Sequence, residues 1–183
     1  MEILEKVLTD AIVLKPRVYK DDRGYFYESF NEKVFKSLSG IGVDFVQDNQ
    51  SVSSKGTLRG LHFQTGDSAQ AKLVRVTKGS AYDVAVDLRP DSPTFKEWYG
   101  VKLSEENHLQ FFIPRGFAHA FVALEDNTIF QYKVDNYYSG VNDGGVIWND
   151  EELGITWPEL KLELSQKDNN LPELNQLNLN TLW

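Results

Sequence analysis

The ten residues KGTLRGLHFQ, Lys55 to Gln64, combine two basic side chains, an imidazole and two glycines in one short run. Arg59 and His62 lie on either side of Gly60. Guanidinium groups bind anions, and a histidine can accept a proton near neutral pH. Strict strand alternation would place Arg59 and His62 on opposite faces. A shared site therefore requires a bulge or bend at Gly60, whereas a scaffold strand would turn both side chains toward water.

Three further polar residues each lie on the apolar face of a different predicted strand. The faces follow from the alternation of side chains along a strand with period two. Lys72 aligns with two valines in KLVRV. His119 aligns with a phenylalanine and an alanine in HAFVA, and Tyr132 with a phenylalanine and a valine in TIFQYKV. We expect all three side chains to point inward, where a small β barrel has room for one ligand.

Composition limits the classes of protein that fit. The 183 residues, 41% hydrophobic and 25% charged, predict one globular domain over residues 1–183. The net charge of −8 makes nucleic-acid binding a poor fit, although clustered basic groups could still bind a small anion. The absence of cysteine excludes disulfides and thiolate metal sites. No leader-like start or membrane-length apolar run is seen, so we expect a cytoplasmic protein without membrane contact.

Short segments rich in Val, Phe, Tyr and Ile recur between residues 11 and 138, separated by turn residues. Pro16 interrupts the first of them. The one convincing helix is NEKVFKSL at residues 31–38, with Asn31 as its cap and an apolar stripe on one side. The chain after residue 157 is ambiguous, with a helical turn or two. This spacing of short strands predicts an antiparallel sandwich or barrel.

The segment IPRGFAHAF, residues 113–121, forms a Pro-x-Gly-x-x-His turn that delivers His119 to the start of a strand. It resembles the second conserved motif of the cupin superfamily, which are small jelly-roll barrels; a hairpin turn with an incidental histidine is the alternative. Many cupins bind a metal through two histidines and a glutamate in their first motif. Here only His62 stands in the corresponding stretch, with no glutamate close behind, so we predict no metal.

Six segments in order extend this resemblance to a family: DDRGYFYESFN, FVQDNQSVSSKGTLRGLHFQ, AKLVRVTKGSAYDVAVDLRPDSPTF, IPRGFAHAF, YKVDNYYS and WNDEELGITWP. Together they resemble the dTDP-4-dehydrorhamnose 3,5-epimerases, over roughly residues 10–172. The resemblance implies a cupin-type antiparallel β barrel or jelly roll with a few short helices. It also implies a dTDP-sugar substrate, a homodimer and no cofactor.

Epimerisation beside a ketone removes a proton from carbon and returns one on the opposite face. A single base on one face would tend to restore the starting configuration. The reaction therefore needs a base, an acid across the ring and a group that stabilises the enolate. Histidine suits the base near pH 7, and a tyrosine can protonate the strongly basic enolate carbon.

The resemblance assigns His62 as general base, Tyr132 as general acid and Lys72 as the group that stabilises the enolate oxygen. It gives Asp168 as the carboxylate that pairs with the base, although Asp83 from the central strands is a rival partner. Taken singly, these residues would be read as a satisfied core histidine, a core tyrosine and a solvated lysine. Their joint presence favours a proton-transfer set.

The resemblance also assigns the substrate contacts. Arg23 and Arg59 match positions that contact the pyrophosphate, which a guanidinium fork suits. The other matching positions are Glu28, Gln47, Asp48, Asn49, His119 and Lys167, while Phe26 and Tyr138 are possible stacking partners for thymine. Asp143 stands where a glutamate is more usual, and the shorter side chain could weaken a hydrogen bond to the nucleotide.

The sequence thus predicts a cofactor-independent 3,5-epimerase of a dTDP-4-keto-6-deoxyhexose. Two alternatives stay open, namely an epimerase acting at C3 or C5 only and a non-catalytic cupin that binds nucleotide sugars. Within KGTLRGLHFQ the prediction becomes geometric. Arg59 should face the pyrophosphate and His62 the sugar ring, with a local irregularity at Gly60 between them.

Overall fold

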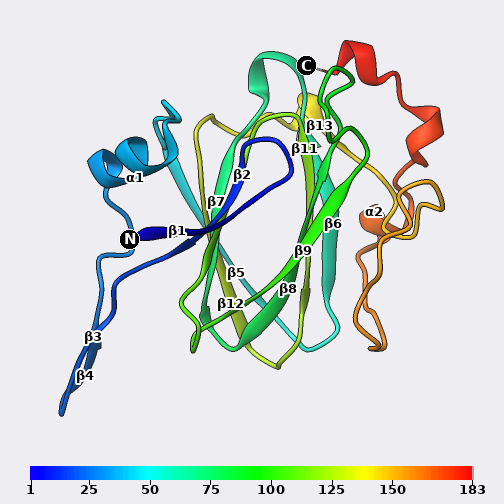
Figure 1. Cartoon of the computed structure of the whole chain (residues 1–183). Coiled ribbons are helices and arrows are strands. Elements are labelled where there is room, and N and C mark those ends of the chain that lie inside the picture. Colours follow the sequence, from blue (N-terminus) through cyan, green and yellow to red (C-terminus); the bar gives the residue numbers. More distant parts are fainter. Residues whose placement is uncertain (183) are drawn as a thin grey trace.

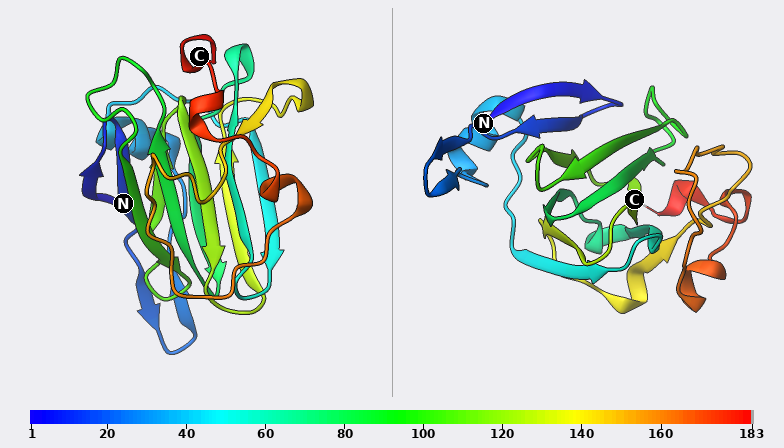
Figure 2. Two further views of the ribbon diagram at one scale, coloured as in Figure 1. Left: turned by 90° about the vertical axis from the view of Figure 1, so that its right-hand side faces the viewer. Right: turned by 90° about the horizontal axis from the view of Figure 1, so that it is seen from below.

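Two antiparallel sheets form the body of the protein in a computed structural model that describes residues 1–182 (Figure 1). In spatial order, the first sheet contains β1 (Glu2–Val7), β2 (Ala11–Lys15), β10 (Gln110–Ile113), β7 (Lys72–Lys78), β12 (Thr128–Val134) and β5 (Gln47–Ser53). The second contains β13 (Asp143–Gly145), β6 (Leu58–Gln64), β11 (Phe117–Ala123), β8 (Ser80–Asp87) and β9 (Trp98–Ser104). The sheets face each other, as Figure 2 shows from below.

This arrangement confirms the predicted fold class, a mainly β antiparallel jelly roll with few helices. The helices are α1 (Glu32–Ser39) and α2 (Gln166–Asn169), with 3-10 turns at Gly66–Ser68, Gly140–Asn142, Leu174–Gln176 and Leu179–Thr181. Every predicted strand segment between residues 44 and 134 contains an observed strand, while β1 and β13 were not anticipated. The predicted single domain, residues 1–183, ends at Trp183, which lies outside the described residues. Neither helix within residues 1–182 has the length and apolarity that a membrane crossing needs.

The core between the sheets explains the strand faces. Val74 and Phe130 from the first sheet meet Ala85, Phe117 and Phe121 from the second, and all five are buried. The rings of Phe121 and Phe130 stack with centroids 4.0 Å apart and an interplanar angle of 3°. Burying one such side chain contributes roughly 1.5–3 kcal/mol. The inward faces predicted from alternation are therefore confirmed.

A second layer covers the outer face of the first sheet. Phe35 of α1 is fully buried against Leu14, Leu73 and Phe112. Asn31 caps the helix by accepting a hydrogen bond from the Val34 amide at 3.2 Å, as the sequence predicted. A cap of this kind stabilises a helix by roughly 1 kcal/mol.

The chain after β13 covers the outer face of the second sheet, and we call residues 146–182 the C-terminal segment (Figure 2). Val146, Leu153 and Leu174 of this segment pack on Val84 and Val86 of β8. A backbone hydrogen bond from the Leu58 amide to the Glu163 carbonyl, 2.9 Å, ties the segment to β6. The segment also carries α2, so this packing positions the helical turn that reaches the site below.

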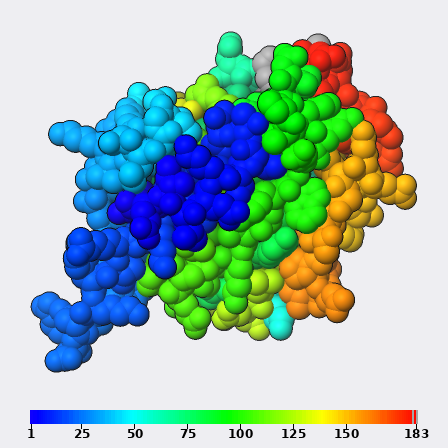
Figure 3. Space-filling view, in the orientation of Figure 1, coloured from blue at the N-terminus to red at the C-terminus, as the bar shows by residue number. Residues whose placement is uncertain are grey.

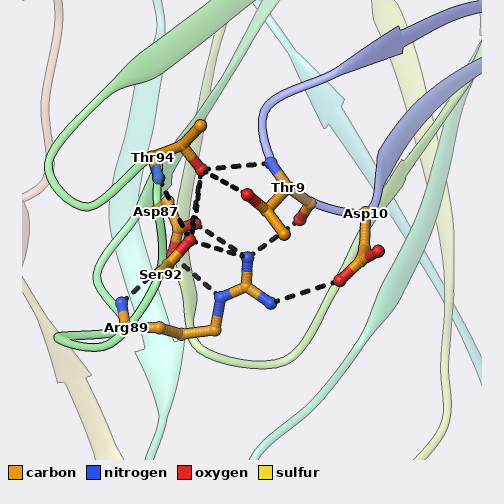
Figure 4. Close-up of polar contacts among 6 residues, drawn as sticks. All are labelled: Thr9, Asp10, Asp87, Arg89, Ser92 and Thr94. Carbon is orange, nitrogen blue, oxygen red and sulfur yellow. Dashed lines mark hydrogen bonds and ion pairs between the residues drawn. The ribbon is translucent and has the colours of Figure 1, made fainter.

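A polar cluster fastens the β1–β2 turn to the loop after β8 (Figure 4). We call it the Arg89 cluster; its members are Thr9, Asp10, Asp87, Arg89, Ser92 and Thr94. The Arg89 Nη2 donates to Asp87 Oδ2 at 2.7 Å and to the Thr9 carbonyl at 2.8 Å. Ser92 and Thr94 donate their hydroxyls to the same Asp87 oxygen at 2.5 and 2.8 Å. The Arg89 Nε donates to the other oxygen, Asp87 Oδ1, at 2.9 Å, so both oxygens of this buried carboxylate are paired.

A two-stranded arm projects from the body (Figures 1 and 3). It consists of β3 (Tyr19–Asp21) and β4 (Gly24–Phe26), which pair with each other. The break after β2 falls at Pro16, as predicted, because proline lacks the amide that a continuing ladder needs. The arm ends in exposed side chains, among them Phe26 at 70% exposure.

Candidate active site

A cavity of about 350 Å³ opens between the sheets, and it brings together the four predicted catalytic residues. Strands β5, β6, β7, β11 and β12 and the α2 turn contribute its walls. It is lined by Gln50, Ser51, Arg59, His62, Lys72, His119, Phe121, Phe130, Tyr132, Ser165, Lys167 and Asp168. His62 belongs to the second sheet and Tyr132 to the first, so the predicted base and acid approach the cavity from different walls.

The predicted irregularity at Gly60 is present. Along β6 the pairing with β11 moves three residues from Arg59 to His62 while β11 moves only two, from Phe121 to His119. Gly60 has φ +120°, and a Cβ there would lie 2.4 Å from the His119 carbonyl oxygen. Only glycine fits this close approach. The extra residue brings both Arg59 and His62 to the same cavity, as predicted.

Asp168, and not Asp83, pairs with His62. The His62 Nε2 lies 2.5 Å from Asp168 Oδ1, and the carboxylate is almost fully buried. Asp168 is fixed by α2, where the Ser165 hydroxyl accepts from the Asp168 amide at 3.0 Å. Burial lowers the pKa of His62, Asp168 opposes that shift, and the positive charges of Lys72 and Lys167 add to it. The imidazole is therefore neutral near pH 7 and can accept a proton.

Lys72 lies at the start of β7, on the inward face with Val74 and Val76. Its Nζ donates to the His62 carbonyl at 3.5 Å. Burial lowers the pKa of Lys72 to about 8, against the opposing charges of Asp83 and Asp143. A half-buried ammonium that donates to one carbonyl within the described chain is a strong donor toward developing negative charge.

Tyr132 lines the cavity from β12, directly across from Val74 on one neighbouring strand and Asn49 on the other. Burial raises the pKa of Tyr132, while the positive charge of Arg59 opposes the shift. The phenol is therefore protonated at neutral pH and can act as an acid.

His119 forms a second histidine–carboxylate pair, in which its Nε2 lies 2.8 Å from Asp83 Oδ2. Both residues are buried, and burial lowers the pKa of His119 against the opposing effect of Asp83. The other carboxylate oxygen, Asp83 Oδ1, is buried and has no hydrogen-bond partner within the described chain. Such an atom is uncommon in a folded protein.

Beside Lys167, which lines the cavity, the Asp143 carboxylate collects three donors. Gln64 Nε2 and the Tyr138 hydroxyl donate to it at 3.2 and 3.3 Å, and Lys167 Nζ makes an ion pair with it. The hydrogen bond to Asp143 raises the pKa of Lys167, so this side chain stays cationic. Three predicted substrate residues, Tyr138, Asp143 and Lys167, therefore form one group beside the cavity.

Other predicted substrate residues do not line this cavity. Arg23, Phe26 and Glu28 belong to the exposed arm and its base, where Arg23 pairs with Asp21 at 2.6 Å. Asp48 pairs with Lys133 at 2.9 Å, beside a neighbouring hollow that shares Gln50 and Tyr132 with the cavity. Asn49 faces the side of β5 that Tyr132 shares, and Gln47 donates to its side chain at 2.9 Å. Their neighbours Gln50 and Ser51 line the cavity in their place.

Sequence reasoning missed several lining residues. Phe121 and Phe130 were read as core, and they form both core and cavity wall. Ser165 has a signal in the sequence, since Ser-x-x-Asp at residues 165–168 is a helix-capping pattern. Ser51 has no such signal. Among residues 1–182, no three His, Asp, Glu or Cys side chains are grouped as a metal site.

The dTDP-4-dehydrorhamnose 3,5-epimerase family model matches residues 5–176. The chain belongs to this family. The dTDP-4-dehydrorhamnose 3,5-epimerase of Escherichia coli (strain K12) is 52% identical over 97% of this chain and 96% of its own length. Among solved structures, dTDP-6-deoxy-D-glucose-3,5-epimerase from Legionella pneumophila, in complex with dTDP-4-keto-L-rhamnose, superposes with a TM-score of 0.95. It has 44% identity and covers 99% of this chain and 96% of the other.

Solved structures of lower identity include one with a narrower activity. A 3'-monoepimerase from Streptomyces bikiniensis, in complex with dTDP-quinovose, superposes with a TM-score of 0.86 at 32% identity. The match covers 99% of this chain and 88% of the other. Its identity is lower than the 52% and 44% of the two 3,5-epimerases above.

Proposed function

We propose that the protein is a dTDP-4-dehydrorhamnose 3,5-epimerase that inverts C3 and C5 of its substrate by proton transfer. The observation that carries the proposal is the approach of His62 and Tyr132 to one cavity from different sheets, with Lys72 entering the same cavity from β7, the strand beside that of Tyr132. The identity to 3,5-epimerases over nearly the whole chain supports the same substrate class.

The residues suggest a balanced reaction. When His62 Nε2–H donates to Asp168, the lone pair on Nδ1 can take the proton beside the ketone. The C–H electron pair moves into the enolate, whose oxygen Lys72 stabilises as an ammonium. Tyr132 then donates its proton to the opposite face of the same carbon. Exchange with solvent restores both side chains, and the second carbon follows the same course.

The nucleotide end is assigned to the cavity mouth. Arg59 lines the cavity from an exposed position, and Lys167 stays cationic beside it. Both suit the pyrophosphate. Tyr138 is 61% exposed and can stack on thymine, with its hydroxyl held by Asp143.

The arm is assigned to the cavity of a second copy in a homodimer. Arg23, Phe26 and Glu28 match substrate-contacting positions, yet in this chain they are exposed and outside the cavity. A mixture of two inactive variants, Arg23→Ala and His62→Ala, tests this assignment. One site of each mixed dimer would hold both native residues, so about a quarter of all sites should recover. No recovery, with exchange of subunits shown, would contradict it.

The decisive experiment is turnover of dTDP-4-keto-6-deoxyglucose in deuterium oxide, followed by NMR. Deuterium at both C3 and C5 is the expected result. Deuterium at only one of the two carbons would identify a mono-epimerase, and binding without any exchange would identify a non-catalytic sugar-nucleotide cupin. Cell fractionation tests the further expectation that the enzyme works in the cytoplasm.

A further inference from the structure

Two buried side-chain oxygens within residues 1–182 have no hydrogen-bond partner, and both belong to the neighbourhood of the cavity. One is Asp83 Oδ1, behind His119, and the other is Ser51 Oγ, which belongs to a residue of the cavity wall but has almost no solvent-accessible surface of its own. Folded proteins pair nearly all their buried polar atoms, because an unpaired one is costly. Ser51 itself lines the cavity, so rotation about its Cα–Cβ bond can turn the hydroxyl toward a bound molecule, which then supplies the missing partner.

The surroundings of Ser51 indicate which part of the substrate that is. Ser51 lies on β5 directly opposite Phe130 of β12, and Phe130 stacks on Phe121. All three line the cavity, so Ser51 lies beside a wall of two aromatic rings. Such a wall suits the C–H face of a sugar ring, and it offers nothing to a pyrophosphate.

Ser53 provides an internal contrast, since it lies two residues along β5 on the same face. Its hydroxyl accepts from Arg59 Nε at 3.2 Å, so it supports the arginine assigned to the pyrophosphate. Strand β5 therefore presents two hydroxyls to one side of the site. One is used within the protein, and the other, on Ser51, is left for the ligand.

We propose that Ser51 Oγ hydrogen-bonds the C2 hydroxyl of the bound sugar, as a specificity-determining contact of the proposed epimerase. A serine hydroxyl both donates and accepts, which matches a sugar hydroxyl. The substrate carries ring hydroxyls at C2 and C3, and C3 is inverted during the reaction. Only the C2 hydroxyl keeps its place through both inversions, so only there does one contact hold the ring throughout. The inference rests on the proposed function.

The test compares Ser51→Ala with Ser54→Ala, a matched control at an exposed serine just after β5. Ser51→Ala should lower kcat/KM for dTDP-4-keto-6-deoxyglucose about 10- to 100-fold. It should leave the Kd of dTDP within twofold of the parent value, because dTDP lacks the hexose and so cannot make this contact. The Tm of the ligand-free variant should be no lower than that of the parent, because a buried unpaired hydroxyl has been removed. Ser54→Ala should match the parent in all three measurements.

A second substrate identifies the hydroxyl. The 2-deoxy analogue of the keto-sugar lacks the C2 hydroxyl. With this substrate the parent and Ser51→Ala should have equal kcat/KM, because neither can make the contact. An equal loss with both substrates would overturn the C2 contact. Unchanged kcat/KM, weakened dTDP binding or a fall in Tm would overturn the role of Ser51 in binding the sugar.

Binding of dTDP-glucose separates this inference from the proposed function, because it needs no turnover and dTDP-glucose carries the same C2 hydroxyl. Ser51→Ala should weaken dTDP-glucose about tenfold or more while dTDP binding is unchanged. If the parent failed to turn over the keto-sugar yet showed this difference, the epimerase proposal would fail and the Ser51 contact would stand. Equal affinities of parent and variant for dTDP-glucose would reject the contact whatever the turnover.

Discussion

Strand β8 carries two aspartates four residues apart, Asp83 and Asp87, and the two are used in opposite ways. Both are fully buried and lie on the same face of the strand. Asp87 has both oxygens paired, chiefly by Arg89 and by the hydroxyls of Ser92 and Thr94 (Figure 4). Asp83 pairs one oxygen with His119 and leaves the other without a partner in the described chain.

The contrast separates a structural charge from a functional one. Burial raises the pKa of Asp87, but its hydrogen bonds to Arg89 and Ser92 outweigh burial and hold the pKa below its ordinary value. Asp83 instead lies where its charge supports the Lys72 ammonium in the cavity. A fully paired carboxylate fastens two loops, whereas an incompletely paired one stays available to influence its neighbours. The four predictions below test this difference.

The largest effect is expected on the cavity side, from His62→Ala. Loss of the base should lower kcat/KM by about 10³- to 10⁴-fold and abolish deuterium exchange at both carbons. Since His62 is partly exposed in the cavity, Tm should change by only a degree or two, and dTDP should still bind. Exchange at the parent rate would remove His62 as the base. A large fall in Tm would show that His62 stabilises the fold as a core residue.

Asp87→Ala should produce the largest loss of stability. Removing it leaves the Arg89 guanidinium beside Phe117 without its main counter-charge, so unfolding free energy should fall by about 3–5 kcal/mol. The folded fraction should keep the parent kcat. Asp10→Asn is the matched control, because Asp10 is 63% exposed and 3.7 Å from Arg89, and it should cost under about 1 kcal/mol. Equal losses in urea unfolding would contradict the central role of Asp87.

Asp83→Asn should affect activity more than stability, the opposite of Asp87→Ala. We expect kcat/KM to fall about 10- to 100-fold at pH 8, and the unfolding free energy to fall less than in Asp87→Ala. The negative charge of Asp83 raises the pKa of Lys72, so its removal should lower that pKa further from about 8. The alkaline limb of the pH profile should therefore move to lower pH. An alkaline limb that does not shift would show that Asp83 does not act through Lys72. The control variant, Asp87→Asn, should leave the alkaline limb at the pH of the parent.

The smallest effect is the pH dependence of the parent enzyme. His62 must be neutral to act as a base, and burial lowers its pKa below the ordinary 6.5. The value of kcat/KM should therefore still be at its plateau at pH 6.5. Below the lowered pKa of His62 it should fall about tenfold per pH unit. Lys72 must be cationic, so kcat/KM should also fall as pH rises above about 8. A profile measured from pH 4.5 to 9.5 checks both limbs. A rate that keeps rising above pH 9 would contradict the need for the Lys72 ammonium.

Much of the cavity follows from local rules that a sequence carries. Alternation along β7, β11 and β12 predicted that Lys72, His119 and Tyr132 point inward, since one face of each strand is apolar. The bulge at Gly60 was predictable because two chemically suited residues, three apart, could not otherwise share a face. In each case the information lies within a few residues of the chain.

Contacts between distant segments were not predictable in this way. The partner of His62 lies 106 residues away on a helical turn of the C-terminal segment, so strand periodicity cannot choose between Asp168 and Asp83. Asp48 was grouped with its neighbours, yet one step along a strand reverses the face, and it pairs with Lys133. The unpaired state of Ser51 depends on the whole surrounding wall, which no pattern of residue types encodes.

The location of Asp168 has a consequence for how the protein responds to heat. The imidazole belongs to a sheet held by the main core, whereas its carboxylate is carried by a segment attached to the outside of that sheet. Peripheral segments generally open at a lower free energy than the core they cover. Warming should therefore detach the segment that carries Asp168 first. The two sheets would stay folded, but His62 would lose its carboxylate partner and catalysis would stop. The temperature at which catalysis stops is then set by the attachment of the last forty residues or so, rather than by the melting of the jelly roll.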